Sequence, residues 1–146
     1  MAVTLGAVLG FLVAGIVIGY GTGGWDAVVA RVLNWKLLLA ICVYFPWALL
    51  QQTLFQFYLL GRLRALFPAV HPIGLSLFNG IAYALVHLPD VWITMMTAFG
   101  GVFWSYMYYQ YRLVLPLALS HAVLGSTFYY WVYGRDLAEV WRAIIE

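Results

Sequence analysis

Five apolar stretches follow one another along the chain, separated by short polar segments. A helix that crosses a membrane needs about 20 mainly apolar residues, and somewhat fewer where neighbouring helices cover it. The pattern predicts five such helices, at Val3–Tyr20, Leu37–Leu60, Ile73–Leu88, Val91–Tyr109 and Leu113–Tyr133. The predicted fold class is therefore all-α, a polytopic membrane helix bundle.

Charged and aromatic residues gather between and after these stretches. The connector GTGGWDAVVARVLNWK, residues 21–36, mixes three charges with two tryptophans. That mixture is typical of a segment at the membrane surface. The tail GRDLAEVWRAIIE, residues 134–146, has apolar residues at helical spacing between charges, which predicts a short amphipathic surface helix. We expect residues 1–146 to form a single transmembrane domain.

Composition strengthens the membrane assignment. The chain is 66% hydrophobic and only 8% charged, whereas soluble domains are about a quarter charged. A formal net charge of +2, carried by scattered basic residues, argues against a nucleic-acid partner. No lysine or arginine precedes the first apolar stretch, so we expect a retained span and not a cleaved signal peptide.

The basic residues indicate an orientation. The turn after the second predicted helix carries Arg62 and Arg64, and the turn after the fourth carries Arg112. Short loops rich in basic residues tend to stay on the cytoplasmic side. With five spans the N-terminus lies on that same side. We therefore expect a cytoplasmic N-terminus, in a prokaryotic-type inner or cytoplasmic membrane.

Polar residues lie inside four of the predicted helices, where they are costly and usually face the bundle interior. They share helix faces in sets: Gln51, Gln52 and Gln56; Asn79, Tyr83 and His87; His121 and Gly125; and the small residues Thr97, Gly101 and Ser105. We expect Gln52, His87 and His121 to converge. We also expect Gln52 and Gln56 to bond to the third or fifth helix, because an unpaired amide in hydrocarbon costs a few kcal/mol. The small residues favour close helix packing.

The order of these motifs resembles the CAAX-protease and bacteriocin-processing family, the intramembrane endopeptidases that include type II CAAX prenyl proteases. The motifs of that family are Glu-Glu-x-x-x-Arg, Phe-x-x-x-His and His-x-x-x-Asn. The matching positions here are Gln51, Gln52 and Gln56, then Tyr83 and His87, then His121 and Gly125. The resemblance covers residues 51 to 125 and implies a four-helix core over residues 37–133.

The resemblance also implies roles, and the departures fall on them. In the family a glutamate activates water, a histidine assists, and the later histidine and asparagine stabilise the oxyanion. Both glutamates are glutamines here, and a carboxamide is far too weak a base to take a proton from water. General-base help typically contributes 10²–10⁴ in rate. We therefore expect a catalytically inactive relative that needs no cofactor and serves as an accessory or scaffold subunit, with the lipid bilayer and other membrane subunits as partners.

Two other functions remain open from the residues. An active peptidase with a rearranged site would use His87, Asp90 and His121 to hold a metal ion or to activate water. A haem- or chlorophyll-binding subunit would use His87 or His121 as an axial ligand, since imidazole suits such metals.

Overall fold

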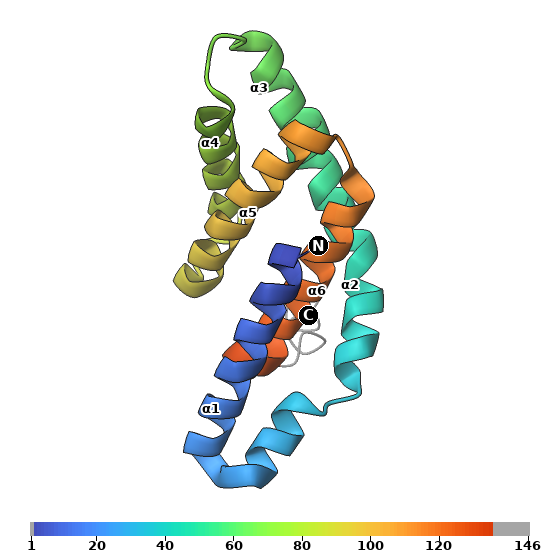
Figure 1. Ribbon diagram of the computed structural model, residues 1–146, viewed down its shortest axis with the longest axis vertical. Helices are drawn as coiled ribbons and strands as arrows, with labels where there is room; N and C mark the ends of the chain where they lie inside the picture. Colours follow the sequence, from blue (N-terminus) through green and yellow to red (C-terminus); the bar gives the residue numbers. More distant parts are fainter. Residues whose placement is uncertain (1, 136–146) are drawn as a thin grey trace. The chain divides into compact units, whose positions relative to one another are not determined.

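The computed structural model describes residues 2–135, and this part of the chain is helical apart from short turns (Figure 1). In chain order the elements are α1 (Ala2–Val32), α2 (Lys36–Gln52), η1 (Thr53–Leu59), α3 (Leu60–Leu66), α4 (Pro72–Leu85), α5 (Val91–Tyr111), α6 (Val114–Thr127) and η2 (Phe128–Tyr133). The elements η1 and η2 are π-helices, with i→i+5 hydrogen bonds. Each of the five predicted spans falls on a helical stretch, and residues 2–135 contain no strand. The all-α fold class is confirmed, whereas the predicted tail helix lies almost wholly outside the described residues.

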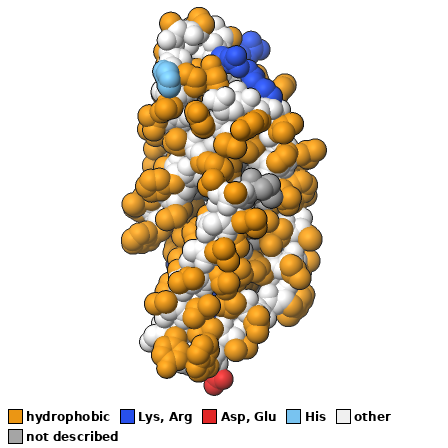
Figure 2. Space-filling view, in the orientation of Figure 1, with side chains coloured by type: hydrophobic (Ala, Val, Ile, Leu, Met, Phe, Trp, Pro, Cys, Tyr) orange, Lys and Arg blue, Asp and Glu red, His pale blue; other side chains and the backbone are white. Residues whose placement is uncertain are grey.

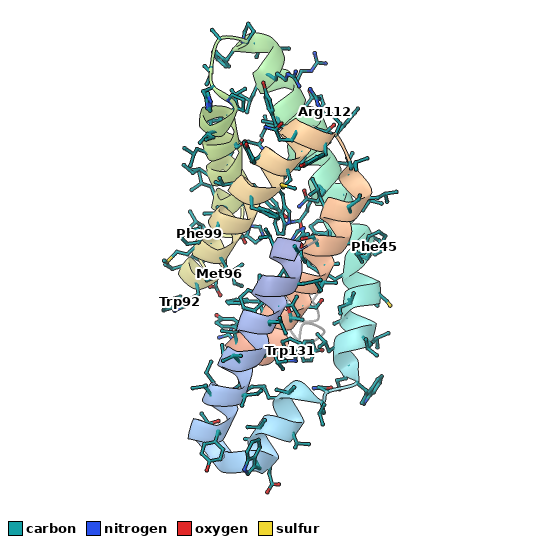
Figure 3. All side chains as sticks on the ribbon, in the orientation of Figure 1. Phe45, Trp92, Met96, Phe99, Arg112 and Trp131 are labelled. Carbon is teal, nitrogen blue, oxygen red and sulfur yellow. The ribbon has the colours of Figure 1, made fainter. Side chains whose placement is uncertain are left out.

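Length and composition fit a membrane bundle. Two continuous helical stretches, Ala2–Val32 and Lys36–Leu66, have 31 residues each and are apolar enough to cross a bilayer. The helix α4 is apolar but shorter. Apolar side chains cover most of the face in Figure 2. On α5, for example, Trp92, Met96 and Phe99 project outward (Figure 3) and are 65%, 39% and 71% exposed. Such a surface suits lipid and not water.

The chain divides into two compact units, and both α2 and α6 contribute residues to each. The first unit comprises the chain up to Trp47 and the chain from Leu119 onward, and the second comprises Ala48–Ala118. In the first unit, Leu37, Ala40 and Tyr130 form a buried cluster. The single domain expected from the sequence stays a prediction.

In the first unit, α1 bends sharply just after the predicted end of the first span. Gly24 has a φ of 68°, in the left-handed region that favours glycine. Beyond the bend the chain returns along α1, so that a Cβ added at Gly19 would lie 3.0 Å from the Cα of Val28. The connector is therefore helical as far as Val32, and it packs back onto the helical stretch that precedes it.

An arginine from this connector closes the end of η2. The last carbonyls of a helix have no partner within the helix. Arg31 donates from Nη1 to the carbonyl oxygens of Trp131 and Val132, at 3.0 and 3.2 Å. Gly134 follows with a φ of 69°, the left-handed conformation that commonly ends a helix. A cation beside these carbonyls also complements the negative end of the helix dipole.

In the second unit, α4 and α5 lie side by side and antiparallel (Figure 1). Their contact has no room for a side chain at two positions. A Cβ added at Gly80 would collide with the backbone nitrogen of Val102, and one added at Gly101 would lie 3.0 Å from the carbonyl oxygen of Gly80. The stripe of small residues on the fourth predicted helix therefore serves close packing, as expected.

We expect Gly80→Ala to lower the free energy of unfolding by about 1–3 kcal/mol, because the added methyl forces α4 and α5 apart. Thermal unfolding in detergent measures this. Gly61→Ala is the matched control, since Gly61 is also helical but nothing lies within 4 Å of its added Cβ. That variant should be unchanged or slightly more stable. Equal stability of the two variants would contradict the close α4–α5 contact.

Candidate functional site

The motif positions are shared between the two units. The second unit contains the glutamine motif and the first histidine motif, and the first unit contains the last motif. In order, these residues are Gln51, Gln52, Gln56, Tyr83 and His87, then His121 and Gly125. Convergence of Gln52, His87 and His121 therefore stays a prediction, and each unit presents its own polar cluster.

The cluster in the second unit is centred on Asn79. The amide nitrogen of Asn79, on α4, donates to Oε1 of Gln56 on η1 at 3.1 Å and to Oγ of Ser105 on α5 at 2.8 Å. Ser105 in turn donates to the carbonyl oxygen of Gly101 at 2.6 Å. The side chains of Gln56, Asn79 and Ser105 are fully buried. Gln56 thus makes the predicted interhelical bond to the third span. The small-residue stripe also supplies an acceptor, Ser105, which the sequence assigned to packing alone.

Gln51 bonds to the same helix through a tyrosine. The hydroxyl of Tyr83 donates to Oε1 of Gln51 at 3.3 Å. The Tyr83 ring is fully buried, with the rings of Phe55 and Trp104 centred 4.6 and 6.0 Å away. A phenylalanine at this position would pack in the same way, but it would leave Gln51 without this donor. The tyrosine and the glutamine therefore act as a pair.

Gln52 does not make the bond predicted for it. Its side chain is fully buried, and neither its amide nitrogen nor its oxygen has a hydrogen-bond partner. The candidate donors on α4 bond to other acceptors. Asn79 donates to Gln56 and Ser105, and the Tyr83 hydroxyl donates to Gln51.

His87 and Asp90 lie beyond the end of α4. The Nδ1 of His87 is 3.3 Å from the carbonyl oxygen of Tyr83, and the two rings meet edge to face with centroids 5.7 Å apart. The Asp90 carboxylate accepts from the backbone N–H of Ile93 at 3.0 Å and so caps α5. Among residues 2–135, no group of three or more His, Cys, Asp or Glu side chains could hold a metal ion.

The cluster in the first unit joins His121 to Tyr44 of α2. The Tyr44 hydroxyl and His121 Nε2 are hydrogen-bonded at 3.1 Å, the tautomer of the histidine deciding which atom donates. Their rings meet edge to face with centroids 5.4 Å apart. A Cβ added at Gly125 would lie only 2.8 Å from Cε1 of Tyr44. The tyrosine ring therefore occupies the space beside residue 125. No motif in the sequence marks Tyr44 for this role.

Neither cluster contains a carboxylate. Of the acidic residues, only Asp26 and Asp90 belong to the described chain; Asp26 is exposed and Asp90 caps α5. The polar groups in the clusters are amides, hydroxyls and imidazoles. They can donate and accept hydrogen bonds, but none of them is a carboxylate.

We expect Gln56→Leu to lower the free energy of unfolding by about 1–2 kcal/mol, because it removes an acceptor of the buried Asn79 amide. Gln52→Leu is the matched control, four residues earlier and equally buried. It should be neutral or stabilising, since it removes an unpaired amide. Thermal unfolding of both variants in one detergent is the measurement. A greater loss for Gln52→Leu than for Gln56→Leu would contradict the bonding described above.

Comparison with known proteins supports the family resemblance that the order of the motifs indicated. A family model described as type II CAAX prenyl endopeptidase Rce1-like matches residues 33–127, well over half of the chain. No curated protein and no solved structure matches the chain significantly. The matched region contains the glutamine motif and both histidine motifs. Because of this match and its apolar helical fold, we conclude that the chain is a membrane protein and that it belongs to the type II CAAX prenyl endopeptidase Rce1-like family.

Proposed function

We propose that this protein is a non-proteolytic member of its family, which serves as a scaffold or accessory subunit in the membrane. One observation carries the proposal: the positions that match the glutamates of the family's first motif are Gln51 and Gln52, neutral amides in a unit whose one acidic residue, Asp90, caps a helix. A glutamine keeps the size and hydrogen bonding of a glutamate without its basicity. The stretch thus retains its packing and loses the group that would activate water.

The neighbouring bonds support a structural role for these amides. Gln51 accepts from Tyr83, and Gln56 accepts from Asn79. These bonds tie the segment from Gln51 to Leu59 to α4. Gln56 also stands where the family has an arginine. Loss of the glutamates and the arginine together avoids leaving a buried charge without its counter-charge, which costs several kcal/mol.

The first unit supports the proposal independently. The last motif of the family ends in asparagine, and here that position is Gly125, against which the Tyr44 ring is packed. His121 is hydrogen-bonded to the same tyrosine. An asparagine at position 125 would need the space that Tyr44 occupies. If Gln51 and Gln52 alone were changed back to glutamate, the last motif would still lack the asparagine side chain that the family has at position 125.

We expect no cleavage of prenylated or leader-type peptides by the purified protein in detergent or in vesicles. The double variant Gln51→Glu/Gln52→Glu should also be inactive, because Gln56 and Gly125 still differ from the family pattern. The measurement is product formation by mass spectrometry, with His121→Ala as the control. Turnover by the unaltered protein that disappears in His121→Ala would overturn the proposal.

The accessory role is tested separately. Almost all of the described chain lies in helices with apolar exposed faces, so residues 2–135 offer little surface to soluble partners. We expect purification in a mild detergent to recover another membrane protein in a fixed ratio. His121→Ala should leave that ratio unchanged, because the role does not depend on catalysis. Recovery of the chain alone, under conditions that preserve other membrane complexes, would contradict an accessory role.

A further inference from the structure

One end of the second unit carries three exposed arginines. Arg62 and Arg64 lie on α3, and Arg112 follows the last residue of α5 (Figure 3). Figure 2 shows basic side chains gathered at this end. We call these three residues the arginine end. Together they are three of the seven lysines and arginines of the chain.

Each of these arginines is held over a tyrosine ring. The guanidinium carbon of Arg64 reaches from α3 to within 4.6 Å of the Tyr109 ring centroid on α5, and Arg112 lies 5.5 Å from the neighbouring Tyr108. Arg62 lies 5.5 Å from the ring of Tyr58. Stacking on a ring holds the guanidinium by its flat face. Its N–H groups lie in the plane of the guanidinium and remain free to bind an anion.

No acid in this unit balances the arginine end. The only acidic residue between Ala48 and Ala118 is Asp90, which caps the opposite end of α5. The helix α5 has 21 residues, a length of about 30 Å, close to the thickness of the hydrocarbon core of a bilayer. The positive charges and the carboxylate are therefore separated by roughly one membrane thickness.

We propose that the arginine end binds the phosphate headgroups of anionic phospholipids in the cytoplasmic leaflet. The flanking surface is apolar and aromatic, with Tyr58, Leu66 and Leu113 more than half exposed, as suits acyl chains and the membrane interface. Guanidinium groups match phosphate oxygens in a two-point geometry. Clusters of basic residues also favour the cytoplasmic side, where anionic lipids lie. If the arginine end faces the cytoplasmic leaflet and the chain has the five expected spans, the N-terminus also lies in the cytoplasm.

The test compares two lipids that differ only in their headgroup. Purified full-length protein is titrated with dioleoyl phosphatidylglycerol or dioleoyl phosphatidylcholine, and retained lipid is measured by native mass spectrometry. We expect at least tenfold tighter retention of the anionic lipid. Arg64→Gln/Arg112→Gln should lose most of this preference, at roughly fivefold per arginine. Arg64→Lys/Arg112→Lys should keep an intermediate preference, because the charge remains while the two-point contact is lost. A lower preference in the Gln variant than in the Lys variant then reflects loss of charge and not a folding defect.

The matched control is Arg135→Gln in the first unit. Arg135 is also exposed and also lies over a tyrosine ring, 4.5 Å from the centroid of Tyr133. That variant should keep the headgroup preference. Equal retention of the two lipids by the unaltered protein would overturn the proposal, as would an equal loss in Arg135→Gln. Inorganic phosphate is the third arm: if it raises the melting temperature as much as the anionic lipid does, the site binds a soluble anion and the proposal is wrong.

Discussion

The amide of Asn79 holds the second unit together, because its two donated bonds reach two other helical elements. Gln56 on η1 and Ser105 on α5 both accept from it, and all three side chains are shielded from solvent. In hydrocarbon no water competes for such groups, so these bonds stabilise the contact, although Asn79 Oδ1 and Gln56 Nε2 have no partner. The contact of α4 with both α5 and η1 is therefore specified by hydrogen bonds as well as by shape.

Close packing at the glycines makes those bonds possible. Gly80, which directly follows Asn79, and Gly101, one turn before Ser105, bring the backbones of α4 and α5 together. Without that approach, the short side chains of Asn79 and Ser105 would not meet at 2.8 Å. Small residues and short polar side chains thus work as a pair in this unit, as is common between membrane helices. Two of the motif glutamines join this arrangement through hydrogen bonds, Gln51 to Tyr83 and Gln56 to Asn79.

Much of the fold can be predicted from the sequence, because the features that begin, extend and end each helix are local runs or single residues. Long apolar runs give the helices, Pro72 and Asp90 begin α4 and α5, and Gly134 follows the end of η2. The Gln56 bond also follows, since a buried amide needs a partner. Other features depend on the fold as a whole. The π-type turns of η1 have no marker in the sequence. The prediction for Gln52 is wrong because Asn79 and Tyr83 donate to other acceptors, and that choice depends on how the helices meet. The position of Tyr44 against His121 and Gly125 depends on how α2 packs against α6, which no motif encodes.

The π-helix η1 also determines how the chain tolerates changes in length. A wide turn accommodates residues that a regular α-helix of the same rise would not. Loss of a single residue from Thr53–Leu59 is absorbed when these turns tighten to regular α-helix. Gln51 and Gln52 would then keep their orientation relative to α3, whereas the same loss within α2 or α3 would turn the residues on either side of it by about 100° relative to one another. The π-type turns are therefore the part of this helical stretch that best tolerates a change in length.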